Sequence, residues 1–165
     1  TVLKLAKDHS QIVMFKHEDW PGLNKLSGIR NGCDTDEVPR LSILVGNAAL
    51  FLPQELQRGA DGAMTGFPYV KMLVVVENLH RNGEIDQAED IFDTFLPLIR
   101  YDQQLGIGMS IRKEILYREN LIKSPFVRLP RSDMSETDYK ELTRLMDRLD
   151  EKLKVSGYGA LIENY

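Results

Sequence analysis

Three short apolar segments alternate with segments of helical spacing in the first half of the chain, and only helical patterns follow residue 83. The apolar segments are residues 12–15, 41–45 and 63–65. Apolar runs of this length, partly β-branched, are typical of buried strands, although the third is too short to show a period. Strands that alternate with helices pair in parallel through right-handed crossovers. The pattern therefore predicts an α/β fold.

The remaining segments are predicted to be helices. They span residues 2–8, 21–31, 48–57, 69–82, 84–105 and 108–119, with a last helix after residue 135. Ser135 and Asp138 have the spacing of a capping box at the start of that last helix. Residues 157–159, Gly-Tyr-Gly, are expected to form a turn near its end.

A sheet of three parallel strands is a poor free-standing domain, because its edges and one face need a cover. The chain also starts at Thr1 in what looks like the middle of an uncapped helix. We therefore expect either a piece of a longer protein or a sheet that a second chain completes. A processed N-terminus is the alternative. Without a cover, apolar sheet surface should be exposed.

Charge and composition exclude some classes of partner. The 165 residues have a formal net charge of −4, which gives no attraction for nucleic acid. The most apolar run, residues 72–76, is too short to cross a membrane. Cys33 is the single cysteine, so no intrachain disulfide can form. This fits a reducing compartment and predicts a cytoplasmic protein.

No motif for a metal or a cofactor is recognisable. The chain has no Walker loop, GxGxxG, HExxH or CxxC pattern. His9, His17 and His80 do not have the spacing of metal ligands. We therefore expect neither a cofactor nor a metal.

Each predicted strand ends at a polar or small residue, which is where α/β folds place their functional groups. These ends are Lys16, Gly46-Asn47 and Thr65-Gly66. Lys16 follows four apolar residues, and burial would lower the pKa of its amine and make it a nucleophile. Such an amine forms a Schiff base with a ketone or aldehyde. The alternative is a lysine that reaches solvent at the strand end.

The glycines and charged residues near these ends have two interpretations each. Gly46, Gly62 and Gly66 would allow a ligand to approach the backbone, but tight turns between strand and helix are the simpler explanation. The run at residues 17–19, His-Glu-Asp, could tune Lys16, although a solvated loop is the simpler interpretation.

Several strings resemble the dihydrodipicolinate synthase / N-acetylneuraminate lyase family, in its order and spacing. Residues 12–19, Ile-Val-Met-Phe-Lys-His-Glu-Asp, resemble the sixth-strand segment with its imine-forming lysine. Residues 44–47 resemble the seventh strand, and residues 58–66 resemble the turn into the eighth. Residues 83–97 resemble the helix that follows, and residues 122–130 resemble the closing segment. The resemblance implies a (β/α)₈ TIM barrel, with its last three β/α units in residues 1–83 and a C-terminal helical region in residues 84–165.

The resemblance also implies a function and a site. Lys16 would form an imine with pyruvate or a sugar-derived 2-keto acid, as part of a class I lyase, aldolase, synthase or dehydratase. Gly46 and Met64 would line the pocket, with Asn47 and Thr65 as further candidates. Family members are often oligomers, so a homo-oligomer is expected, or a partner that supplies the N-terminal half of the barrel. The alternatives are a non-catalytic half-barrel module and a regulatory ligand binder.

Two departures from the family pattern bear on activity. The resemblance begins at the sixth strand, so the family's carboxylate-binding motif and its proton-transfer tyrosine are not matched. The isolated chain is therefore expected to be poorly active. The seventh-strand loop reads Gly-Asn-Ala-Ala at residues 46–49 instead of Gly-Asp-Asp. This favours an aldolase or dehydratase branch over the lysine-pathway synthases.

Overall fold

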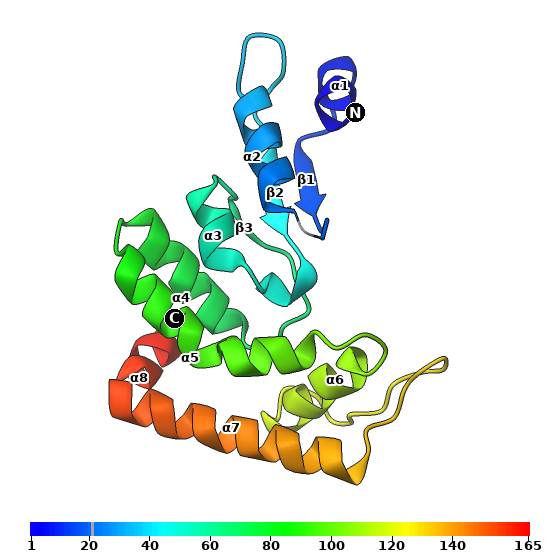
Figure 1. Cartoon of the computed structure of the whole chain (residues 1–165), viewed down its shortest axis with the longest axis vertical. Helices are drawn as coiled ribbons and strands as arrows, with labels where there is room; N and C mark the ends of the chain where they lie inside the picture. Colours follow the sequence, from blue (N-terminus) through cyan, green and yellow to red (C-terminus); the bar gives the residue numbers. More distant parts are fainter. Residues whose placement is uncertain (21) are drawn as a thin grey trace. The chain divides into compact units, whose positions relative to one another are not determined.

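A computed structural model describes residues 1–20 and 22–165 (Figure 1). The chain divides into two compact units, Thr1–Thr65 and Gly66–Tyr165. The division predicted at residue 83 separates a barrel part from a helical region, and it stays a prediction.

Unit 1 contains a three-stranded parallel sheet in the order β1-β2-β3, which confirms the α/β class. In the register, Lys16 lies beside Leu44, and Leu44 lies beside Gly62. The strands are β1 (Met14–His17), β2 (Ser42–Val45) and β3 (Gly62–Ala63), and the helices are α1 (Val2–Asp8), α2 (Leu23–Gly32), the 3₁₀ helix η1 (Asn47–Ala49) and α3 (Leu52–Gln57).

The two faces of this sheet differ in burial. Ile43 and Val45 are fully buried and share a face with His17. Right-handed crossovers place both connecting helices over one face of a parallel sheet. On the opposite face Met14 is 43% exposed. Lys16, two residues further along the strand, points to the same face and is exposed as well. The expected exposure of apolar sheet surface is therefore found on the face that carries Lys16.

The segment after β2 differs from the single helix predicted over residues 48–57. Asn47, Ala48 and Ala49 have φ angles of 51°, 54° and 61°, so the chain makes a left-handed turn before α3 begins. A right-handed helix cannot pass through such residues, and each left-handed residue other than glycine costs roughly 1–2 kcal/mol. Helical spacing alone does not reveal this turn.

A network of charged groups links α2 to the amino ends of β2 and β3. Asp61 accepts hydrogen bonds from Arg30 at 2.6 Å and from the backbone N–H of Ile43 at 2.7 Å, and it also pairs with Arg40. Arg30 donates in addition to the carbonyl oxygen of Gly59 at 2.8 Å. Burial raises the pKa of the Asp61 carboxyl, but these donors outweigh it and lower the pKa overall. The network fixes the end of the sheet opposite Lys16.

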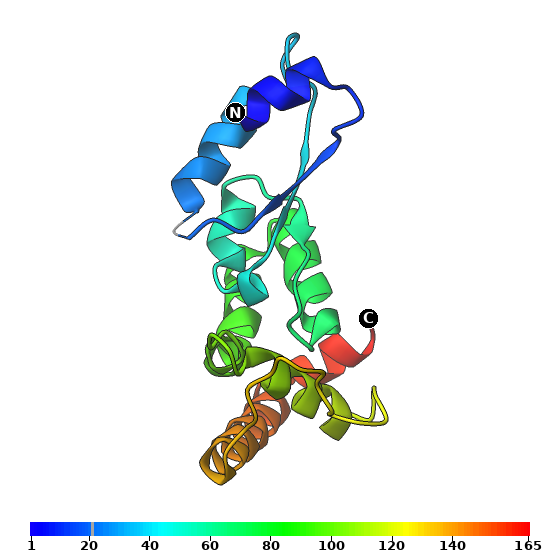
Figure 2. The same ribbon diagram turned by 90° about the vertical axis from the view of Figure 1, so that its right-hand side faces the viewer.

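The regular elements of unit 2 are all helices, as the sequence predicts after residue 83, and non-helical segments connect them. Its helices are α4 (Val70–Arg81), α5 (Ile85–Asp102), α6 (Gly108–Arg118), α7 (Glu136–Ser156) and α8 (Tyr158–Glu163). Figures 1 and 2 both show α7 running along α5. Helix α5 also packs against α4 and α6. The core residues exposed by 1% or less include Met72, Val75, Val76, Ile91, Phe95, Leu98, Ile99, Ile111 and Ile115.

The ends of α7 follow the sequence prediction closely. The Ser135 hydroxyl accepts from the N–H of Asp138, and the Asp138 carboxylate accepts from the N–H of Ser135, so the capping box is confirmed. Gly157 ends the helix in the left-handed conformation that glycine favours. The turn is shorter than predicted, because Tyr158 already begins α8. No helix in the described part of the chain is long and apolar enough to span a membrane.

Candidate functional site

Lys16 lies on β1, one residue before its carboxyl end, and its side chain is 42% exposed. The expectation that this side chain is buried is therefore wrong for this structure. The physical reason is the sheet face on which it lies, because the helices cover the opposite face. Lysine on an open face extends its charged end into water.

Glu18 is the acidic group that accompanies Lys16. Its Oε1 atom lies 3.4 Å from Lys16 Nζ. The same side chain lies over Gly46, where an added Cβ would come within 2.2 Å of Oε1. Glycine at position 46 therefore makes room for the Glu18 carboxylate. A ligand that approaches the Gly46 backbone would meet this carboxylate first.

Asn47 joins the same group of residues through the backbone of the first strand's loop. Its Nδ2 atom donates to the carbonyl oxygen of Glu18 at 3.2 Å. The left-handed turn at Asn47 brings the amide there, while Ala48 and Ala49 behind it are buried. Backbone strain of this kind is concentrated at functional sites in proteins. The structure thus brings together Lys16, Glu18, Gly46 and Asn47.

The loop that carries Glu18 is held from both sides. The His17 ring is buried on the helix-covered face, and its Nε2 bonds to the carbonyl oxygen of Gly22 at 3.0 Å. A carbonyl only accepts, so His17 donates through Nε2–H. Asp19 is paired with Lys25, which lowers the pKa of its carboxyl. The Asp19 carboxylate therefore pairs with Lys25, whereas the Glu18 carboxylate pairs with Lys16.

Met64 and Thr65 follow β3, the next strand of the sheet. The Met64 N–H donates to the carbonyl oxygen of Val45 at 2.8 Å, so the segment stays attached to β2 beyond the end of β3. The Met64 side chain is 39% exposed. The Thr65 hydroxyl oxygen is buried without a hydrogen-bond partner among the described residues. A buried unpaired hydroxyl is costly, and a polar ligand group would relieve that cost. No contact links these two residues directly to Lys16, and their role stays a prediction.

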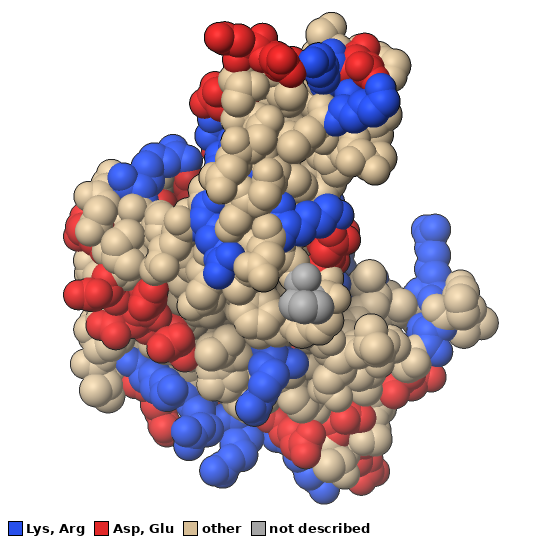
Figure 3. Space-filling model, turned by 45° about the horizontal axis from the view of Figure 1, so that its top comes forward, with Lys and Arg blue, Asp and Glu red and all other residues tan. Residues whose placement is uncertain are grey.

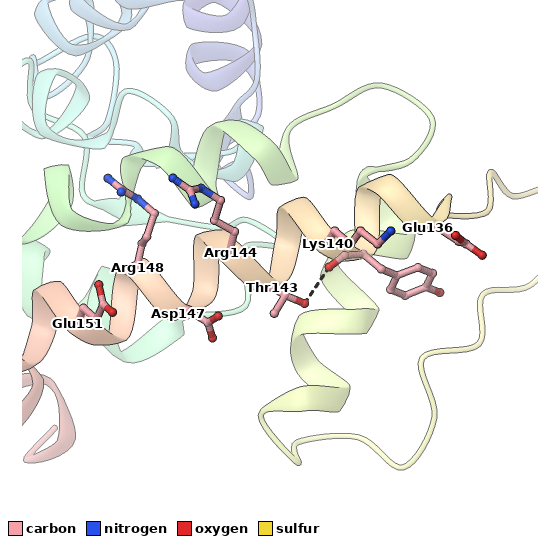
Figure 4. A pocket seen from close by; sticks show the side chains of 8 residues that line it. Glu136, Lys140, Thr143, Arg144, Asp147, Arg148 and Glu151 are labelled. Carbon is pink, nitrogen blue, oxygen red and sulfur yellow. Dashed lines mark hydrogen bonds between the residues drawn. The ribbon is translucent and has the colours of Figure 1, made fainter.

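Other surface features lie away from these strand ends. A hollow of about 770 Å³ runs along the outside of α7, and all its lining residues belong to that one helix. In Figure 4 the side chains of Arg144 and Arg148 extend from one side of α7 and that of Asp147 from the other. The hollow lacks the enclosing walls of a small-molecule pocket. On the face drawn in Figure 3, basic and acidic side chains are interspersed. Among residues 1–20 and 22–165, no group of His, Cys, Asp or Glu could hold a metal ion.

Comparison with known proteins shows which family the chain resembles. No family model matches the chain. A crystal structure of dihydrodipicolinate synthase from Rhodopseudomonas palustris matches 89% of the chain with 43% identity and a TM-score of 0.85. Over 89% of its length the chain is therefore similar to members of the dihydrodipicolinate synthase family. Its fold is accordingly that of the TIM-barrel family, with three β/α units in unit 1 and the start of unit 2.

Two further proteins are similar to the chain. L-2-keto-3-deoxyarabonate dehydratase from Azospirillum brasilense is 30% identical over 89% of the chain. The 4-hydroxy-tetrahydrodipicolinate synthase of Methylacidiphilum fumariolicum shares the fold over 99% of the chain, with a TM-score of 0.79 and 23% identity. The chain spans about half the length of each of these proteins: 46% of the dehydratase, 49% of the Rhodopseudomonas synthase and 50% of the Methylacidiphilum synthase.

Glu18 is exposed in the loop after β1, as the solvated-loop interpretation predicts, whereas His17 is buried. The contact of Glu18 with Lys16 was not predicted from the sequence. A signal for it was present, because residues two apart on a strand point to the same face. Glu18 follows Lys16 by two residues, and Gly46 occupies the equivalent position on the neighbouring strand. Applying the period of two beyond the apolar run would have placed Lys16 and Glu18 together.

Proposed function

We propose that this chain carries the imine-forming part of the active site of a class I lyase that acts on a 2-keto acid, with Lys16 as the nucleophile. The observation that carries the proposal is the pairing of Lys16 with Glu18, 3.4 Å apart at the end of a parallel strand. Similarity to the dihydrodipicolinate synthase family supports it. Gly46, Asn47, Met64 and Thr65 would bind the substrate.

The dehydratase branch is the favoured reaction type. The Azospirillum relative is a dehydratase of a 2-keto-3-deoxy sugar acid. The loop at residues 46–49, Gly-Asn-Ala-Ala, also departs from the pattern of the lysine-pathway synthases. A protein of this fold from E. coli, YagE, was crystallised with pyruvate, which fits a small keto acid as ligand for the family.

The chemistry follows from an amine and a carboxyl group in contact. The Lys16 amine attacks the C2 carbonyl, and loss of water leaves an imine whose protonated form attracts electrons from C3. Removal of a C3 proton gives an enamine. When an acid protonates the C4 hydroxyl, the enamine expels this hydroxyl as water. Hydrolysis of the imine then returns the lysine. Glu18, 3.4 Å from Lys16 Nζ, would carry these protons.

Borohydride trapping with a panel of 2-keto acids tests the nucleophile, read by intact mass and peptide mapping. We expect one adduct, on Lys16, and its loss in Lys16→Arg. Lys25→Arg is the matched control, because Lys25 lies in the same unit with a similar exposure. A folded wild-type chain that gives no adduct, or an adduct on another lysine, would contradict the proposal.

Exchange of the C3 protons of the keto acid with D₂O, followed by NMR, tests Glu18 separately. We expect Glu18→Gln to form the imine but to lower the exchange rate at least about tenfold, within the range of general acid–base catalysis. Asp19→Asn is the control, because Asp19 is paired with Lys25. Equal rates in the two variants would remove Glu18 from the mechanism.

A second candidate is a non-catalytic segment of a barrel with an idle lysine. The exposure of Lys16 and the open sheet face favour it. In that case no keto acid is trapped, although the chain is folded. Binding of a keto acid that survives Lys16→Ala would instead indicate a regulatory binding site.

Three further expectations accompany the proposal. Assembly into a homo-oligomer, or with a chain that supplies further strands, would cover the open face that carries Met14. The division between a barrel part in residues 1–83 and a helical region in residues 84–165 is retained. A cytoplasmic location is retained as well, because the single cysteine fits a reducing compartment.

A further inference from the structure

Asp102 and Arg112 form an ion pair inside unit 2, next to the segment that leaves β3. The Asp102 side chain is fully buried, and Arg112 Nε lies 2.9 Å from both of its carboxylate oxygens. The guanidinium also donates to the side chain of Gln103 at 3.4 Å. Asp102 is the last residue of α5, whereas Arg112 lies on the second turn of α6. The pair therefore fixes the orientation of the Arg112 side chain.

The held guanidinium lies against Gly66. A Cβ added to Gly66 would be 2.8 Å from Arg112 Nη1 and 3.2 Å from Cζ. These distances leave no space for a side chain at position 66 while Arg112 keeps its place. Gly66 is bonded directly to Thr65, one of the residues predicted to line the substrate pocket.

Burial makes this pair costly to maintain. Burial raises the pKa of the Asp102 carboxyl to about 6, although Arg112 opposes the shift. Replacing a buried ion pair by apolar residues often leaves stability unchanged or improves it, so stability alone is a weak reason for the pair. A buried ion pair instead suits a residue that must be held in one place. The Thr65 hydroxyl, next to Gly66, has no hydrogen-bond partner among the described residues, and its placement would matter to a ligand.

We propose that Arg112, held by Asp102, is a positioning residue that fixes the backbone at Gly66 and, through it, the Met64–Thr65 end of the substrate site. The consequence for substrate binding rests on the function proposed above. Arg112 touches neither the substrate nor Lys16 in this scheme. It acts through the peptide backbone.

Hydrogen–deuterium exchange of peptides that cover residues 62–67 tests the positioning without any need for activity. We expect Arg112→Met to increase exchange there about tenfold. Arg118→Met is the matched control, because Arg118 lies on the same helix with a similar exposure and pairs with Glu114. It should leave residues 62–67 within about twofold of the wild type. A purely structural role would raise exchange throughout α5 and α6 and leave residues 62–67 no more affected than those helices.

A double-mutant cycle adds a second readout. Gly66→Ala alone should disturb the segment, because the new methyl group meets the guanidinium. In the Arg112→Met background, Gly66→Ala should raise the exchange of residues 62–67 clearly less, because the shorter methionine side chain leaves space for the new methyl group. Independent effects of the two changes would overturn the proposal. Arg112→Lys, which keeps the charge beside Asp102 but not the planar guanidinium, serves if Arg112→Met fails to fold, and it should show the same local rise in exchange.

Borohydride trapping then connects the segment to the site. In Arg112→Met we expect the keto-acid concentration for half-maximal trapping to rise about tenfold, with a smaller change in the rate at saturation. If the wild type is not trapped at all, the proposed function fails, while the exchange experiment still decides the role of Arg112. If the wild type is trapped and Arg112→Met behaves identically in exchange and in trapping, the positioning role is wrong.

Discussion

The two units of this chain differ in how completely their apolar surfaces are covered. Unit 2 surrounds a core of long apolar side chains with five helices and satisfies the ends of its longest helix through a capping box and a C-terminal glycine. Unit 1 has one short sheet, and one face of this sheet is open. The candidate reactive residues, Lys16 and Glu18, lie on that open face. The difference indicates that stability and chemistry are separated along the sequence. Unit 1 should therefore unfold more easily than unit 2.

Spectroscopy can follow the units separately. Trp20 is the single tryptophan and belongs to unit 1, where its ring lies 5.2 Å from that of Phe51. Far-UV circular dichroism is dominated by helices, most of which lie in unit 2. We expect the fluorescence transition in urea to precede the dichroism transition. Coincident transitions would mean that the units unfold together.

The largest effect is expected from Phe95→Ala in the core of unit 2. Phe95 is 1% exposed and its ring packs against that of Tyr69. Truncating a buried phenylalanine costs about 3–5 kcal/mol, so the dichroism transition should move to lower urea. Phe126→Ala, at a site that is 60% exposed, is the control and should cost less than about 1 kcal/mol. A fluorescence transition that moves equally far would show that unit 1 depends on this core.

A smaller loss, in the other unit, is expected from Asp61→Asn. The change removes the charge that pairs with Arg30 and Arg40 and leaves the partly buried Arg30 without its partner. Breaking such a network costs about 2–4 kcal/mol, which should appear first in the Trp20 transition. Asp8→Asn, in an exposed pair with Lys4, is the control.

The pH dependence of Asp61 has a definite sign. Its folded pKa lies below the ordinary value of 3.8, so its contribution is present above pH 3.8 and is lost as the pH falls through the folded pKa. Asp61→Asn should therefore reduce the acid sensitivity of the Trp20 transition. If the variant and the wild type lose stability in parallel below pH 4, another group dominates.

The smallest effect, a gain, is expected from Glu55→Gln on α3. Burial raises the pKa of the Glu55 carboxyl to about 7, and its Oε2 atom has no hydrogen-bond partner among the described residues. The raised pKa means that this group contributes most stability below pH 4.5, and the contribution is lost as the pH rises through 7. At pH 8 the amide should stabilise unit 1 by roughly 1–3 kcal/mol, and near pH 5 by much less.

Unfolding in urea at pH 5 and pH 8 measures this gain, with the exposed Glu151→Gln on α7 as the control. A Glu55→Gln variant that is less stable than the wild type at pH 8 would mean that the ionised carboxylate has a favourable partner.

Much of the architecture was readable from local patterns. The apolar runs near residues 12–15 and 41–45 became β1 and β2, shifted by one or two residues, and the helix predicted over residues 69–82 became α4. Ser135 and Asp138 formed the predicted cap, because a capping box depends only on residues three apart. The site was readable in part, since Lys16, Gly46 and Asn47 were singled out by their places at the strand ends.

The sequence by itself determined the order of the elements, the parallel sheet and the position of Lys16 at the end of a strand, because spacing, crossover handedness and capping are local properties. Tertiary structure alone decided that Lys16 is exposed, because burial depends on which sheet face the helices cover. It alone brought the Glu18 carboxylate over Gly46, because these residues follow the ends of two different strands. It also decided that Arg112 reaches Gly66, 46 residues away in sequence, because only the packing of α5 against α6 aims that side chain.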